Sequence, residues 1–218
     1  MGLQRRRPTR LHSSFFSFGL LIRTAFFLNI LLLGDVVGRA GREAVNAHLP
    51  GLKRDLAVDT AIVNAENAAH GFGLTEKICG ELYEAGADTL TTGNHVWDQR
   101  ELITYIARDD RVLRPANFPD GTPGEGWRLH RLADGRTVLV INLMGRLFMD
   151  ALDDPFAKLG ALLERFPLGA GADAIVVDLH GEATVCGAFV QIDGATGLAR
   201  RIEPVRVGGR LTPYLPRL

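Results

Sequence analysis

Four short apolar segments of this chain each end in a cluster of polar residues, and this repeated pattern constrains the fold more than any other feature. Uninterrupted apolar runs are typical of strands that are covered on both faces of a sheet. The segments and their polar endings are residues 28–33 with Gly34 and Asp35, 60–63 with Asn64, Glu66 and Asn67, 89–92 with Gly93, Asn94 and His95, and 174–179 with His180, Gly181 and Glu182.

The segments between these strands have helical spacing or capping residues, which predict helices over residues 42–55, 75–85, 98–107 and 155–165. Thr75 and Asp98 stand where caps are expected, and Pro155 holds a first helical position. Pro50 is expected to kink or end its helix. Two predicted hairpins join 127–132 to 137–143 and 188–192 to 198–205. The order predicts a layered α/β domain with a mixed sheet.

The first 27 residues differ in charge from the rest of the chain, because they hold five arginines and no acid. Arg23 and Asn29 interrupt the apolar run 15–33, which argues against a membrane span, and no A-x-A site precedes Asp35. We interpret residues 1–27 as an appendage that is disordered or results from a start codon assigned too early. A signal or anchor is the alternative, and residues 28–218 are expected to form one domain.

Charge and cysteine content exclude several classes of protein. The formal net charge is zero, which gives no case for binding duplex nucleic acid. The two cysteines, Cys79 and Cys186, lie far apart and form no C-x-x-C pair, which argues against a disulfide scaffold, a zinc ribbon or an iron–sulfur site. This usage fits a reducing compartment, so we expect a cytoplasmic protein without a membrane partner.

The polar residues at the strand ends are the candidate functional residues, because ligands of open α/β sheets bind outside the carboxyl ends of the strands. A set of carboxylate, amide and imidazole donors suits manganese or iron, or zinc. Two such ions can clamp a phosphoryl group and generate hydroxide near neutral pH. His95 could then protonate a leaving oxygen. The candidate ligands are Asp35, Glu66, Asn67, Asn94 and His180.

Each of these residues also has an ordinary structural explanation. A lone Asp after a strand is commonly a cap or turn former, and Asn tolerates a left-handed turn. Three further residues are candidate substrate contacts with the same reservation: Arg39 near the first strand end, His70 in the second polar segment and Asn117. The case for function depends on the occurrence of four polar endings in order.

Six motifs carry a resemblance to a known family. They are GDVVG at 34–38, NAENAAHGFG at 64–73, GNHxWD at 93–98, RPANFP at 114–119, DDPF at 153–156 and DLHGEAT at 178–184. The chain resembles the YmdB-type 2′,3′-cyclic-nucleotide phosphodiesterases of the calcineurin-like metallophosphoesterase superfamily. The resemblance implies an α/β/β/α sandwich, two divalent metal ions and hydrolysis of phosphodiesters. It makes the five candidate ligands metal ligands, with Glu66 as the bridge, and His95 the proton donor.

One departure from the family pattern is large. Family members continue after this last motif with a stretch that carries GTHTH, whose two histidines complete the metal centre. Here Thr184 runs almost directly into Cys186, and no histidine follows His180. Residues 187–206 resemble the family's closing hairpin, so the domain is predicted to be internally truncated after residue 184. We expect a weakly held second ion, reduced turnover, and an exposed strand edge that a homo-oligomer would cover.

Three hypotheses about function follow from the sequence. The first is a metal-dependent phosphodiesterase that acts on a cyclic nucleotide or a related small phosphodiester through a metal-activated hydroxide. The second is a catalytically impaired descendant that binds nucleotide or protein. The third is a membrane-anchored phosphoesterase, which would require residues 28–33 to leave the sheet.

Overall fold

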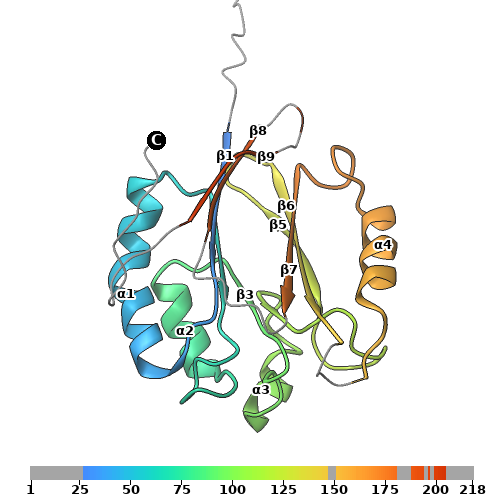
Figure 1. The fold of residues 1–218 in the computed structure, drawn as a ribbon. Coiled ribbons are helices and arrows are strands. Elements are labelled where there is room, and N and C mark those ends of the chain that lie inside the picture. The colour runs from blue at the N-terminus through green and yellow to red at the C-terminus, as the bar shows by residue number, and fades with distance from the viewer. Residues whose placement is uncertain (1–26, 147–150, 181–187, 194–195, 197–198, 205–218) are drawn as a thin grey trace, which may run out of the picture.

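The computed structural model describes residues 27–146, 151–180, 188–193, 196 and 199–204 of the chain. Its strands form two sheets that face each other, and helices cover the outer side of each sheet (Figure 1). This is the predicted α/β/β/α sandwich, and the predicted fold class is confirmed. The expected appendage, apart from Phe27, and the expected truncation point at residues 184–186 lie outside the described residues.

The larger sheet has the strand order β4-β3-β2-β1-β8-β9. Its first four strands are parallel to one another, and β8 pairs antiparallel with β1 and β9. The long apolar run in β1 fits this central place, because the strand is covered on both faces. The strands are β1 (Phe27–Leu33), β2 (Thr60–Asn64), β3 (Thr89–Thr91), β4 (Val112–Leu113), β8 (Ala188–Asp193) and β9 (Ala199–Pro204).

The smaller sheet has the order β5-β6-β7. Strands β5 (Trp127–Arg131) and β6 (Thr137–Met144) form an antiparallel hairpin, and β7 (Ala174–His180) runs parallel to β6. Both predicted hairpins are therefore confirmed. The last residue of β7, His180, lies beside Met144 at the end of β6.

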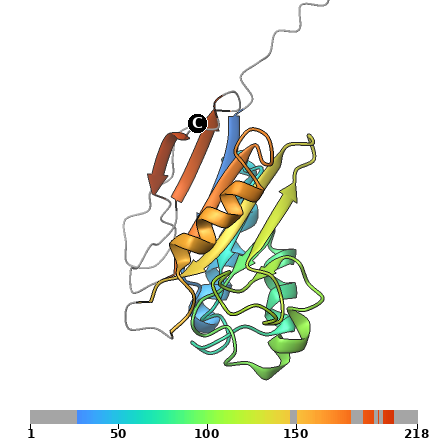
Figure 2. The same ribbon diagram turned by 90° about the vertical axis from the view of Figure 1, so that its right-hand side faces the viewer.

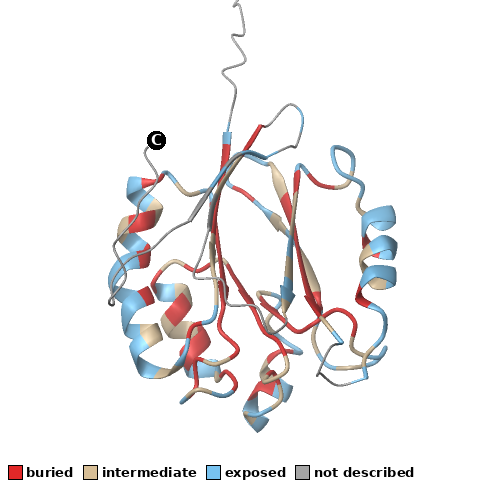
Figure 3. Cartoon of the chain, viewed as in Figure 1, coloured by how far each residue is buried: buried red, intermediate tan, exposed pale blue. Residues whose placement is uncertain are grey.

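Four helices complete the described part of the chain: α1 (Gly38–Asp55), α2 (Glu76–Glu84), α3 (Arg100–Tyr105) and α4 (Pro155–Arg165). Helices α1 and α2 lie on the outer side of the larger sheet, and α4 crosses the outer side of the smaller one (Figures 1 and 2). The two sheets share an apolar core that includes Leu28 and Ile62 from one sheet and Val138 and Val140 from the other. Figure 3 shows the exposed outward faces of α1 and α4.

Helices α1 and α3 differ from the sequence prediction. Helix α1 begins at Gly38 rather than at residue 42. Helix α1 continues through Pro50 to Asp55. The helix therefore does not end at Pro50, which was one of the two expected outcomes. Leu49 and Leu52 are buried on either side of the proline, and their packing holds both turns against the sheet. Helix α3 begins at Arg100 rather than at Asp98, and its N-cap residue makes no side-chain cap.

The predicted starts of α2 and α4 are confirmed. The Thr75 hydroxyl accepts a hydrogen bond from the backbone N–H of Ile78, 3.3 Å away, as an N-cap does. Pro155 occupies the first turn of α4, behind Asp154, whose carboxylate accepts from the backbone N–H of Phe156 at 2.8 Å. No helix in the described part of the chain has both the length and the apolar character needed to cross a membrane.

Candidate metal centre

The loops that follow β2 and β3 meet the end of β7 from the opposite sheet. Glu66 follows β2, Asn94 follows β3, and His180 ends β7. The His180 Nε2 atom lies 2.8 Å from Glu66 Oε1 and 3.0 Å from Asn94 Oδ1. The structure therefore brings together three of the five predicted ligands. Asn94 and His180 are 86 positions apart in the chain.

The chemistry of this cluster fits a cation. One imidazole nitrogen can share at most one proton, yet it faces two oxygen acceptors. The three atoms are all metal-ligand types, and adjacent ligands around an ion bound at about 2.1 Å are about 3 Å apart in octahedral geometry. Within the described residues no group of three His, Cys, Asp or Glu side chains is arranged to hold a metal ion, so the third candidate donor here is the amide oxygen of Asn94.

Burial and a glycine shape the cluster. The Glu66 side chain is 1% exposed, and its second oxygen accepts from the backbone N–H of His95 at 3.3 Å. A Cβ atom on Gly93 would lie 2.3 Å from Glu66 Oε2 and 2.4 Å from His180 Cδ2. Only glycine therefore leaves room at position 93 for the carboxylate and the imidazole.

A second pair of predicted ligands, Asp35 and Asn67, joins the loop after β1 to the loop after β2. Asn67 Nδ2 donates to Asp35 Oδ1 at 2.7 Å. The Oδ1 atom of Asn67 is buried and has no hydrogen-bond partner among the described residues. An unpaired buried amide oxygen is costly, and a bound cation would satisfy it. Asp35 has a φ of +42°, a left-handed conformation that Asp tolerates better than most residues.

His95 is held by the residue that sequence reasoning placed at a helix cap. Its Nδ1 atom lies 2.7 Å from Asp98 Oδ2. An imidazole that binds a carboxylate through Nδ1 has a fixed ring orientation and presents Nε2 to a ligand. The ring of Phe72 packs against the His95 ring edge to face, with centroids 5.0 Å apart. Asp98 is thus a missed site residue, although its place three residues after His95 in GNHxWD was a usable signal.

Asp178 is a second residue that sequence reasoning did not assign to the site. Its Oδ2 atom accepts hydrogen bonds from Thr91 Oγ1 and, at 3.4 Å, from Asn64 Nδ2. These bonds join the end of β7 to β2 and β3 of the other sheet. Asp178 lies two residues before His180 on the same face of β7, and this spacing was the available signal.

The electrostatics of His180 follow from its neighbours. Burial lowers the pKa of His180, but the hydrogen bond and the charge of Glu66 raise it, and the charges of Asp178 and Asp35 add to this effect. The net pKa is above the usual histidine value. The end of β7 therefore lies in a strongly negative environment, of the kind that attracts cations.

The candidate substrate contacts have different surroundings. Arg39 is exposed on α1, and its Nε lies 2.6 Å from Glu43 Oε1. His70 is exposed, with a left-handed φ of +57°. Asn117 is 0% exposed. Its amide nitrogen donates to the carbonyl oxygens of Met144 and Asp153, and its oxygen accepts from the Met144 N–H.

These contacts assign Asn117 a structural role. Its amide oxygen and nitrogen are engaged with the backbone, and the side chain is inaccessible to a ligand. The expectation that Asn117 contacts substrate is therefore not supported by the geometry, because the buried backbone groups at the end of β6 require partners. Arg39 and His70 remain candidate contacts.

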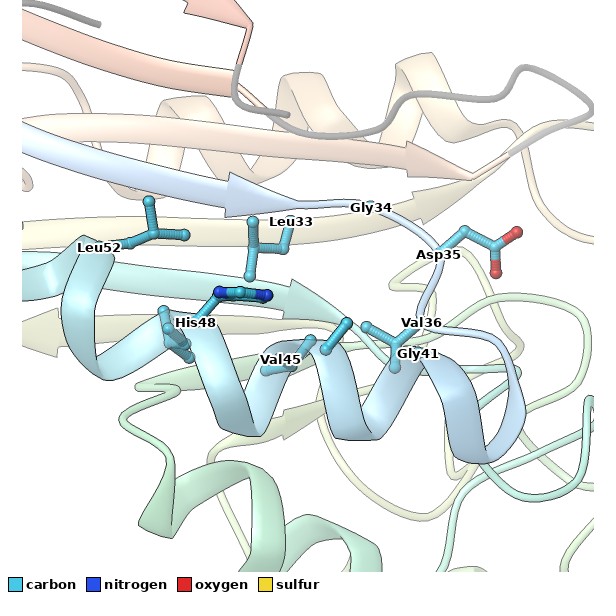
Figure 4. Close-up of a pocket in the computed structure, with 10 residues that line it drawn as sticks. Leu33, Gly34, Asp35, Val36, Gly41, Val45, His48 and Leu52 are labelled. Atoms are coloured by element: carbon cyan, nitrogen blue, oxygen red, sulfur yellow. The ribbon is translucent and has the colours of Figure 1, made fainter. Parts of the chain in front are cut away.

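A cleft of about 190 Å³ lies beside the second ligand pair, between α1 and the end of β1 (Figure 4). Its lining is mainly apolar, and includes Leu33, Val45 and Leu52 together with His48. In Figure 4 the Asp35 carboxylate points away from these side chains. Asp35 itself lines one end of the cleft, so the cleft adjoins the candidate ligands at the end of β1.

Residues 31–186 match the model of a family described as YmdB-like protein. The chain belongs to the YmdB-like family. This confirms the resemblance that the motifs indicated. A Bacillus subtilis (strain 168) relative named 2′,3′-cyclic-nucleotide 2′-phosphodiesterase is 46% identical over 157 residues, which cover 72% of this chain and 58% of that protein.

Two solved structures are similar to the chain. A hypothetical protein from Thermus thermophilus shares 41% identity and a TM-score of 0.65, over 72% of this chain and 59% of that one. A novel phosphatase from Mycoplasma pneumoniae has a TM-score of 0.74 at 21% identity, over 84% of this chain and 94% of that one, and shows a common fold. This YmdB-like chain spans somewhat more than half the length of its Bacillus and Thermus relatives.

Proposed function

We propose that this chain is a metal-dependent phosphodiesterase that hydrolyses 2′,3′-cyclic nucleotides. The observation that carries the proposal is the meeting of His180 Nε2 with oxygens of Glu66 and Asn94 at 2.8 and 3.0 Å. The name of the Bacillus relative supports the choice of substrate. A small phosphodiester is therefore the proposed partner, rather than duplex nucleic acid or a membrane.

The residues that would hold metal are the five donors at the strand ends. Glu66, Asn94 and His180 would form one group, and Asp35 and Asn67 the other, with Glu66 as the proposed bridge. The donor set suits manganese or iron, and zinc is the alternative. When bound, such ions polarise phosphoryl oxygens and supply a nucleophile near neutral pH.

The remaining chemistry belongs to His95. As the oxygen of a water molecule bonds to phosphorus, the water gives up one proton to solvent and the bond from phosphorus to a ribose oxygen breaks. His95 Nε2 delivers a proton to that ribose oxygen, and the product is a nucleoside monophosphate. Asp98 acts as a positioning residue, because its 2.7 Å contact with Nδ1 fixes the orientation of the His95 ring.

The number of donors limits the second ion. The described structure offers five donors in two groups, and no histidine follows His180 in the sequence. A two-metal site needs enough ligands for both ions while an open position remains for substrate. We therefore propose that one ion binds well, that the second binds weakly, and that turnover is lower than in longer relatives.

The test is metal titration and hydrolysis on the purified full chain. We expect calorimetry with Mn²⁺ to show one strong site and a weak second one, and chromatography to show hydrolysis of 2′,3′-cyclic AMP that needs added metal. Chelator-treated enzyme without metal is the control. Hydrolysis that is independent of metal, or no hydrolysis with Mn²⁺, Fe²⁺ or Zn²⁺, would refute the proposal.

A second function is favoured by the same shortage of donors. A catalytically impaired descendant would keep the fold and bind a nucleotide or a protein without turning it over. Calorimetry with 2′,3′-cyclic AMP separates the two hypotheses, because this descendant would bind the nucleotide and release no product.

The proposal that the chain associates with copies of itself depends on the edge strand β7. Among the described residues β7 pairs with β6 alone, and Val177 and Leu179 are exposed on it. Free strand edges favour association, so we propose a homo-oligomer, which light scattering would detect as a mass above 23.7 kDa.

The proposed location is the cytoplasm. The free buried thiol of Cys79 fits this location.

A further inference from the structure

Phe72 is an exposed aromatic residue beside the proposed proton donor. Its side chain is 59% exposed, although removing a phenylalanine side chain from water is favourable. Its ring meets the His95 ring edge to face, at a centroid distance of 5.0 Å and an interplanar angle of 69°. Phe72 therefore offers aromatic surface to solvent immediately beside the His95 ring.

The loop that carries Phe72 is held in place by hydrogen bonds. The Phe72 N–H donates to the Ala69 carbonyl at 3.0 Å, and the Phe72 carbonyl accepts from Gln99 Nε2 at 2.9 Å. Gly73 packs so closely that a Cβ there would lie 2.8 Å from Gln99 Cγ. The backbone positions of Phe72 and of the segment after His95 are thus fixed relative to each other.

The chemistry of the leaving group says what this surface would contact. The argument rests on the proposed function, in which His95 protonates the leaving oxygen. In a 2′,3′-cyclic nucleotide that oxygen belongs to the ribose, and the same ribose carries the base. The group next to His95 on the substrate side is therefore a nucleoside.

We propose that Phe72 is a specificity-determining residue that stacks on the nucleobase of the substrate. Stacking on an aromatic ring tolerates every base, because each base has a π-face. Phe72 would then favour nucleosides over base-free cyclic phosphates without selecting one base strongly. The expected contribution is about tenfold in affinity.

The test compares two substrates on the full chain with Mn²⁺. One is 2′,3′-cyclic AMP, and the other is glycerol 1,2-cyclic phosphate, which has the cyclic diester but no base. For Phe72→Ala we expect the ratio of the two KM values to shift about tenfold against the nucleotide. Phe72→Trp should keep or increase the preference. Phe27→Ala removes another exposed phenylalanine, at the amino end of β1, and is the matched control.

Phe72→Leu separates stacking from packing. Leucine keeps apolar bulk against His95 but has no aromatic face, so it should lose the nucleotide preference as alanine does. The proposal is overturned if leucine behaves like the wild type, or if Phe72→Ala weakens both substrates equally.

A binding measurement keeps this inference separate from the proposed function. If the chain binds 2′,3′-cyclic AMP in calorimetry but hydrolyses nothing, the catalytic proposal fails while the tenfold loss of affinity in Phe72→Ala still tests stacking. If the wild-type chain neither binds nor hydrolyses the nucleotide, both proposals are wrong.

Discussion

Two carboxylates, Glu66 and Asp109, differ in what surrounds them. Asp109 Oδ2 accepts hydrogen bonds from the hydroxyls of Tyr83 at 2.9 Å and Tyr105 at 2.6 Å. Its other oxygen accepts from the backbone N–H of Arg111 at 3.0 Å. The Glu66 carboxylate instead faces His180 Nε2, an atom that Asn94 also approaches.

A structural acid and a proposed metal ligand can therefore be distinguished by the hydrogen-bond donors around them. Asp109 has enough hydrogen-bond donors around it. Burial raises the pKa of Asp109, but the hydrogen bonds from Tyr105, Arg111 and Tyr83 lower it by more, so the net shift is downward. The Glu66 cluster has more acceptor atoms than protons to share. Such a cluster is stable with a cation and costly without one.

The largest expected effect comes from Glu66→Gln. This substitution keeps the shape and removes the charge, and turnover should fall about 1,000-fold, beyond the 10- to 100-fold typical of residues that only support ligands. Calorimetry should show weaker Mn²⁺ binding. The melting temperature without metal should not fall, because the new amide adds a donor among acceptors. Wild-type turnover in this variant would contradict the ligand assignment.

The next effect separates the ligands from the proton donor. His95→Gln should lower kcat about 100-fold, since general acid catalysis contributes at least that much. Its Mn²⁺ affinity should stay close to that of the wild type, because His95 contacts Glu66 through its backbone N–H. If Mn²⁺ affinity falls with kcat, His95 belongs with the ligands instead.

Asp109→Asn is the matched change in the structural network. We expect the free energy of unfolding to fall by about 1–3 kcal/mol, because two phenols and a backbone N–H lose a charged acceptor. Urea denaturation measures this loss. Turnover should not change, and a large loss of kcat without unfolding would remove the contrast with Glu66.

The difference in stability between the wild type and Asp109→Asn should depend on pH. The pKa of Asp109 is lowered in the folded state, so its contribution to stability is present above the unfolded pKa of about 3.9 and is lost as pH falls through the folded value. The stability difference between wild type and Asp109→Asn should shrink below about pH 4. A difference that grows in acid would mean that the carboxylate is not stabilised by its donors.

The smallest expected effect is at Arg39. Its contact with Glu43 is exposed, so Arg39→Gln should leave the free energy of unfolding unchanged within experimental error. If Arg39 also contacts the substrate phosphate, KM should rise about two- to fivefold. Arg54→Gln, which breaks an exposed pair with Asp55 at the far end of α1, is the control. Equal KM values for both variants would remove Arg39 from the site.

Local sequence patterns were enough to predict the order of the helices and strands and many of their boundaries. Apolar runs and capping residues act over a few neighbours, so β1, the start of α2 at Thr75 and the hairpin β5–β6 could be predicted from local patterns. The family motifs added the sandwich, which is confirmed, and the proposed ligand set.

Which polar side chains contact one another depends on the tertiary packing. Asp98 was expected to cap a helix but contacts His95 instead. The Asn117 side chain binds backbone groups of β6 and of a distant loop, and Asp178 joins the two sheets. Each outcome depends on atoms that lie far apart in the chain or on competing local partners. Sequence spacing does not encode such distances, because packing of one sheet against the other sets them.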